Sequence, residues 1–259
     1  MEHGYQMLRH VVAQVFGNFG QAARLTLLLT FLPMALLLVL FLQTGVPYNS
    51  FPGGRMEPAM APGSNGGLLF LAVLAGIVVS AITYCWAAVG WHRFVLLEEH
   101  GNGIVPQWRG PNILSYIGRA ILIGVVVMLI GIVSGMLLTM IMFAAPVQAV
   151  GFVLATGWVM GMSWVITRMG LILPAAALGK PMTIRESWTA TKPVATDLLV
   201  PLFVIAVAMN LLSELIMLLF TNSTLGMIPL AFLYWMQVLL NLSLMTTLYG
   251  TQVEGRPLT

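Results

Sequence analysis

The chain has 259 residues, of which 59% are hydrophobic and 7% are charged, against a charged share of about 25% in an ordinary soluble domain. Water cannot wet such a surface over its whole area, so lipid is the expected solvent. The net charge of +3 does not indicate a nucleic-acid partner, because no cluster of cations is present that could neutralise several phosphates. The single cysteine, Cys85, excludes an intramolecular disulfide.

The first element in chain order is an amphipathic segment within residues 1–21. A helical face with the spacing of a membrane-surface helix is formed by Tyr5, Leu8, Val11, Val12, Val15, Phe16 and Phe19. Such a helix is expected to lie in the plane of the membrane.

Six apolar stretches follow, each long enough to cross about 30 Å of hydrocarbon. They cover residues 22–43, 67–91, 117–143, 148–173, 198–220 and 226–250. The first is too long for the apolar core of a signal peptide and has no small-residue cleavage site after it, so it is expected to be retained. The predicted fold is an all-α polytopic membrane protein with six transmembrane helices in a single domain, residues 1–259.

Lysine and arginine fall in alternate gaps between these stretches. Seven of the eleven lie before the first span, between spans two and three, between spans four and five, or after span six, and three more, Arg24, Arg119 and Arg168, lie near the span ends that adjoin these gaps. The other gaps hold only Arg55. Because cytoplasmic loops are enriched in these residues, we expect both termini to lie in the cytoplasm.

The cytoplasmic segments suggest a threefold repeat. Gly103, Gly179 and Gly255 recur at intervals of 76 residues, each near a proline. The predicted unit is a short interfacial helix followed by a hairpin of two spans: residues 1–21 and hairpin 22–103, then an elbow with its hairpin over 104–181, and an elbow, hairpin and tail over 182–259. Trp108 and Trp188 mark the interfacial elbows, since tryptophan favours the headgroup layer. Thr183 and Glu186 have the spacing of a capping box.

One outer loop departs from this pattern. Residues 44–66 are rich in proline and glycine and are an insertion into the first hairpin. They are interpreted either as a periplasmic contact arm or as a tolerated surface loop. Rows of small residues in the spans favour either a homodimer seam or packing within the bundle; they are Ala72, Gly76 and Ser80, Gly131 and Gly135, and Gly157 and Gly161.

Polar residues at membrane depth are the strongest functional candidates, because their burial is costly without partners. Glu214 is the only acidic residue well inside a span. With it we predict an intramembrane polar network of Asn210, Tyr234, Gln237 and Asn241 on spans five and six. Glu214 is interpreted either as an ion-coupling or substrate-binding carboxylate, or as part of a structural lock between the two spans.

Four cations near the cytoplasmic ends of the spans are candidate headgroup contacts: Arg24, Arg93, Arg119 and Arg168. Lipid binding would explain the positions of these cations, and so would the topology signal by itself. Glu98, Glu99 and His100, with His92 nearby, are interpreted as a solvated edge. No catalytic, cofactor-binding or metal motif is found, and none of these sites is expected.

The segment from Arg168 to Lys192 carries a resemblance. Its Leu173-Pro174-Ala175 run, Ser187-Trp188 pair and following Thr191-Lys192 are similar to a segment of poorly characterised bacterial six-span inner-membrane proteins. Those proteins resemble the membrane domain attached to some glycerophosphodiester phosphodiesterases. The resemblance implies a bacterial inner membrane. It does not imply hydrolysis, which in that family belongs to a soluble domain for which this chain has no room.

The function expected from the sequence is non-enzymatic. We expect a lipid-associated inner-membrane protein or an accessory, organising subunit, with membrane lipids, a larger membrane complex or a second copy as partners. The alternative is a small-solute transporter or channel that uses the region of Glu214. The deep polar residues cluster on spans five and six, and spans one and three contribute only a few hydroxyl residues, which makes that alternative weaker.

Overall fold

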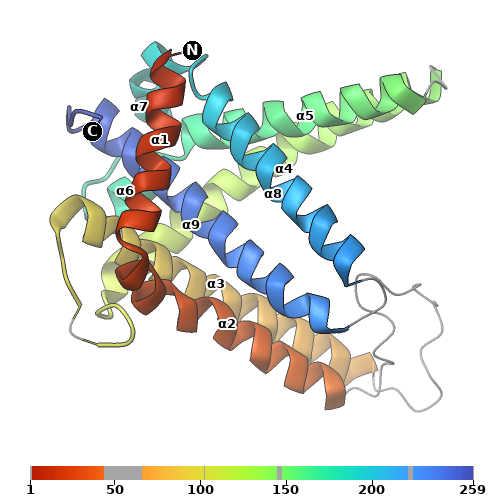
Figure 1. Ribbon diagram of the computed structural model, residues 1–259, viewed down its shortest axis with the longest axis horizontal. Coiled ribbons are helices and arrows are strands. Elements are labelled where there is room, and N and C mark those ends of the chain that lie inside the picture. The colour runs from red at the N-terminus through yellow and green to blue at the C-terminus, as the bar shows by residue number, and fades with distance from the viewer. Residues whose placement is uncertain (1, 44–65, 102, 145–147, 221–223, 259) are drawn as a thin grey trace.

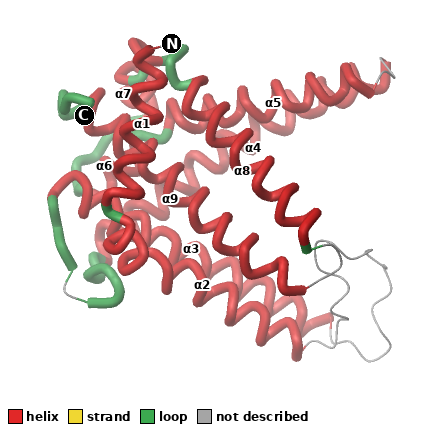
Figure 2. Tube along the Cα trace, in the orientation of Figure 1, coloured by secondary structure: helices red, strands yellow, loops and turns green. Residues whose placement is uncertain are grey.

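The computed structural model describes residues 2–43, 66–101, 103–144, 148–220 and 224–258, and within them every regular element is a helix (Figure 2). The α-helices are α1 (Glu2–Gly17), α2 (Phe19–Gln43), α3 (Gly66–Leu97), α4 (Gly110–Ala144), α5 (Gln148–Met169), α6 (Ile172–Ala177), α7 (Ile184–Ala190), α8 (Leu199–Leu219) and α9 (Met227–Gln252). Two 3₁₀ turns, Lys192–Val194 and Thr224–Gly226, precede α8 and α9.

Six helical segments are long and apolar enough to cross a membrane, which confirms the predicted fold class. They are α2, α3, α4, α8, α9 and, fourth in chain order, the segment Val153–Ala177, which includes most of α5 and all of α6. The chain is a multi-pass membrane protein. Predicted and observed ends differ most at α4, which begins at Gly110 and takes Pro111 into its first turn, where a missing N–H costs nothing.

The six spans form three hairpins, α2–α3, α4–α5 and α8–α9, which diverge from one end of the molecule (Figure 1). We call the end where α3, α6 and α9 finish the base. Both termini lie on the base side, away from the tips of the hairpins (Figure 1). The loop predicted over residues 44–66 lies, except for Gly66, outside the described residues.

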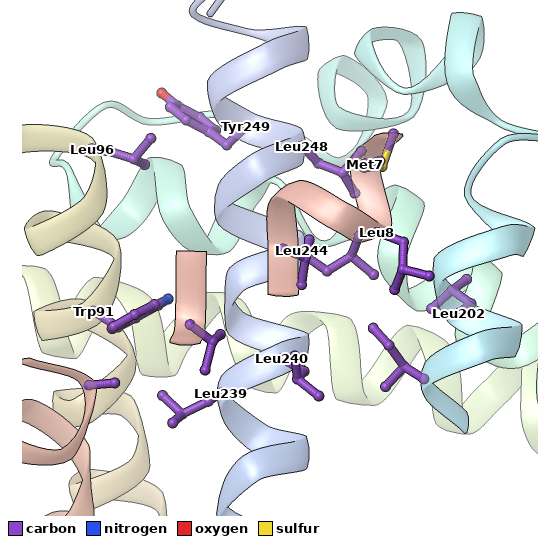
Figure 3. Packing of buried hydrophobic residues seen from close by; sticks show 14 of the residues in the cluster. Met7, Leu8, Trp91, Leu96, Leu202, Leu239, Leu240, Leu244, Leu248 and Tyr249 are labelled. Carbon is purple, nitrogen blue, oxygen red and sulfur yellow. The ribbon is translucent and has the colours of Figure 1, made fainter. Parts of the chain in front are cut away.

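The core is concentrated at the base and centred on α9. Leu240, Leu244 and Leu248 recur along one side of this helix and are buried, as is Leu239 on another side. Figure 3 shows them surrounded by side chains from α1, α3 and α8. Toward the hairpin tips the apolar side chains are mostly exposed, as expected of helices whose outer faces contact lipid.

The amphipathic helix α1 packs across the base against α8 and α9. One row of its residues, Met7, Leu8, Val11 and Val15, is buried in the core. Gly4 permits the close approach, because a Cβ at this position would collide with the carbonyl oxygen of Asp197. The predicted helix is therefore present, although only part of its apolar face is available to lipid.

The other predicted elbows differ from one another. The capping box that opens α7 is confirmed: the Thr183 Oγ1 accepts from the Glu186 N–H at 3.2 Å, and the Glu186 carboxylate accepts from the Thr183 N–H at 2.7 Å. Between α3 and α4, by contrast, none of the described residues is helical. Gly101, Gly103 and Pro106 oppose a helix there. The threefold repeat stays a prediction.

Candidate functional site

The three hairpins end in a similar backbone geometry. α3, α6 and α9 are each followed within a few residues by one in the left-handed region: Glu98 (φ 55°), Gly179 (φ 73°) and Gly255 (φ 69°). In each case the next N–H bonds back to a carbonyl near the end of the helix, as in glycine-terminated helix caps. The last two of these residues are the glycines of the predicted repeat, whereas the first is Glu98, five residues before Gly103, because α3 ends at Leu97.

Basic side chains at these ends link one hairpin to the next. The Arg93 Nη1 on α3 donates to the carbonyl oxygen of Ala177, at the end of α6, at 3.1 Å. The Lys180 Nζ, just after α6, lies 3.2 Å from the Glu254 Oε1 after α9. The first bond supplies a partner for a carbonyl that the end of a helix leaves without one.

A third bond closes the ring. The Arg256 Nη2 donates to the carbonyl oxygen of Leu96 on α3 at 2.6 Å, across 160 residues of sequence. Arg256 also contacts the carboxylate of Glu254 at 2.8 Å. The first hairpin is thus bonded to the second, the second to the third and the third to the first. We call these contacts the base ring.

Glu99 lies between two arginines of the base. Its carboxylate accepts from the Arg93 Nε at 2.8 Å and from the Arg109 Nη2 at 2.9 Å. Partial burial favours the neutral carboxyl, but the hydrogen bonds and charges of the two arginines outweigh it and lower the pKa of Glu99. The predicted solvated edge is therefore wrong for Glu99, which is part of an ion-pair network. A polar cleft of about 330 Å³ adjoins it, but its lining arginine, Arg93, is already paired.

His92 was also predicted to lie at a solvated edge, and this is wrong: it is fully buried between α3, α4 and α9. Its Nδ1 lies 2.7 Å from the Thr246 Oγ1. The Thr246 hydroxyl donates to the Leu242 carbonyl, so it must accept from His92 and the proton lies on Nδ1. The Nε2 can then accept from the Tyr116 hydroxyl at 3.4 Å. His92 acts as a neutral link between three helices.

Arg168 has a different environment from the predicted headgroup contact. It is 6% exposed, and its guanidinium lies 3.9 Å from the ring centre of Trp188 and 4.9 Å from that of Trp164. It donates to the Trp188 carbonyl at 2.7 Å and to the Thr191 Oγ1 at 3.2 Å. The Ser187 hydroxyl in turn donates to the Arg168 carbonyl at 2.7 Å. Arg168 therefore holds α7 against the end of α5.

The other three predicted cations and Trp108, the other predicted elbow residue, lie at separate places on the base. Arg24 is exposed, whereas Arg119 is half-buried and bonded to Ser115 on its own helix. Arg93 belongs to the base ring. Trp108 is exposed and packs edge-on against Trp86 at 5.0 Å between ring centres. Of the four predicted cations, only Arg24 is thus both exposed and without a side-chain hydrogen bond or ion pair among the described residues.

The predicted intramembrane polar network on spans five and six is not formed within the described chain. The Asn210 Nδ2 donates to the Ala206 carbonyl of its own helix at 2.8 Å, and Glu214 is exposed. Tyr234 packs against Tyr84 of α3, with ring centres 6.4 Å apart. Gln237 is half-buried and Asn241 is exposed. The structure therefore does not bring these five residues together.

The small-residue rows are used unequally. Gly76 lies against Leu37 of α2, and Gly135 lies against Trp158 of α5. Trp158 donates to Ser134 at 2.9 Å, which fixes its ring over α4. These rows serve packing within hairpins. Gly157 and Gly161 have open space beside them.

The most distinctive concave feature is an apolar groove of about 600 Å³ beside α1, in the size range of ligand pockets. Helices α8 and α9 form its sides, and α1 with the start of α2 closes its base end. Its lining is entirely apolar: Leu8, Val12, Phe16, Phe19, Val204, Ile205, Ala208, Met209, Leu212, Phe232, Leu233, Met236 and Leu240. We call this the α1 groove.

The helix that closes this groove is predicted by the sequence, but the groove itself is not. The apolar face of α1 is divided. Its centre is buried in the core, while Tyr5, Val12 and Phe16 form an exposed stripe beside it, which Phe19 continues at the start of α2. Exposed Arg9 lies one helical turn from Val12. The split could not be read from the sequence, because apolar residues that contact protein and those that contact lipid are of the same types.

No protein-family model, curated protein or solved structure matches the chain. The resemblance given for residues 168–192 therefore stays a prediction. Four of the residues that carry it, Arg168, Ser187, Trp188 and Thr191, nevertheless form one bonded cluster.

Proposed function

We propose that the protein is a non-enzymatic, lipid-associated protein of the bacterial inner membrane, and that it holds a phospholipid acyl chain in the α1 groove. The observation that carries the proposal is the lining of the groove, which is apolar on every side and lies beneath an amphipathic helix. An acyl chain matches such a lining, whereas a polar solute would lose its hydrogen bonds to water there.

The charge distribution supports an orientation for this lipid. Ten of the eleven cations belong to the base side of the spans, and this bias supports a cytoplasmic location for the base and both termini. The α1 groove then opens toward the inner leaflet. Arg9, on the exposed edge of α1, is available to a phosphate at the level of the headgroups.

The transporter alternative has less support. Glu214 lies on the face of α8 opposite Ile205 and Met209, which line the α1 groove. A solute path through Glu214 would need a wet cavity reaching it, with polar residues from several hairpins. Asn210 and Glu214 belong to one helix, and the other predicted polar residues face elsewhere.

The proposal is tested with a phospholipid that carries a photoreactive group in its acyl chain. The protein is reconstituted in vesicles, irradiated, digested and analysed by mass spectrometry. We expect labelling concentrated on the groove residues of α8 and α9, including Met209 and Met236. Replacing Ala208 by Phe fills the groove and should reduce this labelling several-fold.

The matched control is Ala81→Phe, the same change at an exposed alanine of α3. It should leave labelling of the groove unchanged. Labelling spread evenly over the lipid-facing side chains of α4 as well, and insensitive to Ala208→Phe, would refute a specific lipid site.

A further inference from the structure

The outward face of α8 carries two polar side chains at membrane depth. Glu214 lies five residues before the end of the helix at Leu219, or about 8 Å along the axis. Asn210 lies one turn further in on the same face. Both are exposed, and no described side chain bonds to the Glu214 carboxyl. Such a group at the lipid boundary is costly unless another molecule supplies a partner.

The exposed residues around this pair follow a heptad spacing. Phe203, Val207, Asn210, Glu214 and Met217 are separated by four, three, four and three residues, and all five are exposed. This is the spacing of a seam along which two helices pack in a left-handed pair. Membrane helices commonly pack in this way, at about 20° to one another. We call these five residues the α8 seam.

The seam lies on the side of α8 away from the protein core. Leu202 and Ile205 are buried and turn the other sides of the helix toward α1, α5 and α9, while all five seam residues stay exposed. The outward side is therefore left for lipid or for another protein. An ordinary lipid-facing helix would have apolar residues at the two central positions of this face, where α8 has Asn210 and Glu214.

We propose that the α8 seam is the interface with a second copy of this chain. Two copies inserted in the same orientation place their α8 helices parallel about a twofold axis, so each seam residue meets its own counterpart or the adjacent layer. The polar pair is self-complementary in this arrangement. An amide donates and accepts, and a carboxylate accepts.

The side-chain directions fit this pairing. Cα–Cβ bonds in a helix tilt toward its N-terminus, so the Glu214 carboxyl leans toward the layer of Asn210 in the second copy. Asn210 uses one of its two amide hydrogens on the Ala206 carbonyl. The second hydrogen is therefore available to the Glu214 carboxylate across the interface. Two such bonds form, one on each side of the axis.

The first experiment is site-directed disulfide formation in membranes. In a Cys85→Ala background, Val207→Cys places a thiol in the seam, and Leu215→Cys places one at a similarly exposed position to its side. On mild oxidation we expect the covalent dimer to form at least fivefold more with Val207→Cys than with Leu215→Cys. Equal formation by both, or none by Val207→Cys, would overturn the proposal.

The second experiment measures self-association without cysteines in the seam. Labelled protein is diluted with lipid in vesicles, and subunits are counted by single-molecule photobleaching. We expect Asn210→Leu with Glu214→Leu to weaken dimerisation about tenfold, since both interfacial hydrogen bonds are lost. Glu214→Gln, which keeps a hydrogen-bonding side chain, should retain the dimer. A protein that is monomeric at every lipid ratio, or unaffected by the double change, would refute the interface.

Discussion

The guanidinium of Arg256 donates to the carbonyl oxygen of Leu96 at 2.6 Å and so joins the last residues of the chain to the end of the first hairpin. If this bond were absent, Glu254 after α9 would still contact Lys180, but the base ring would be open between the third and first hairpins. This bond gives the C-terminal segment a structural role that its position after the last span does not suggest.

We expect Arg256→Ala to destabilise the folded protein. Hydrogen bonds to charged groups contribute about 1.5–3 kcal/mol, and partial exposure of Arg256 reduces this to about 1–2 kcal/mol. The loss is measured as a lower free energy of unfolding in mixed detergent micelles. Arg185→Ala, at an exposed arginine on the same side of the membrane, is the control and should change stability little. Equal effects of the two changes would contradict a specific role for the Leu96 bond.

Glu99 predicts a pH dependence of stability. Its pKa is lowered in the folded protein, so it contributes stability that is fully present above the unfolded carboxyl value of about 4.3 and is lost as the pH falls through the lowered folded value. Glu99→Gln should therefore lower stability at pH 7 and flatten the loss of stability between pH 5 and acid. Thermal unfolding over this range tests the prediction. Glu98→Gln changes an exposed neighbour and should preserve the wild-type dependence.

A matched pair of threonine variants tests the hydrogen bond between Thr246 and His92. Thr246→Val keeps the shape of the side chain but leaves the buried Nδ1–H of His92 without an acceptor, at a cost of about 1–3 kcal/mol. Thr251→Val removes a hydroxyl that bonds within its own helix and should cost much less. Chemical unfolding in micelles compares the two. If both variants have the same stability, His92 does not depend on Thr246.

Arg168 should not be replaceable by lysine. Its planar guanidinium lies over the Trp188 ring and donates in two directions, which an ammonium group cannot reproduce. We expect Arg168→Lys to lower the free energy of unfolding by about 1–3 kcal/mol. It should also increase proteolysis near α7. Arg24→Lys, at an exposed site, is expected to behave as wild type. Resistance of Arg168→Lys to unfolding and proteolysis would show that charge alone suffices.

The elements that sequence predicted best are those set by local chemistry. Six spans follow from runs of apolar residues longer than the membrane is thick, and the start of α7 follows from the side chains of Thr183 and Glu186. Both signals lie within a few turns of chain. They require no knowledge of what packs against them.

The orientation of side chains around each span could not be predicted in the same way. A membrane helix is apolar on all sides, so sequence does not show which side meets protein. For this reason Glu214 was expected to face α9 but lies on the outward side of α8. His92 and Arg168 were assigned to polar surroundings because they are polar residues near helix ends, yet both are buried among partners that come from other helices.

Arg9 provides a test of where a lipid headgroup lies. If the acyl chain occupies the α1 groove, the phosphate lies at the edge of α1, where exposed Arg9 is one helical turn from Val12 of the stripe. One such cation at a membrane surface contributes about 1 kcal/mol to binding an anionic lipid. Arg9→Gln should therefore reduce the enrichment of anionic over zwitterionic phospholipid that co-purifies with the protein by about fivefold. Arg24→Gln removes an equal charge away from the stripe, so a similar reduction by that control would mean that net charge, and not a site at α1, selects the lipid.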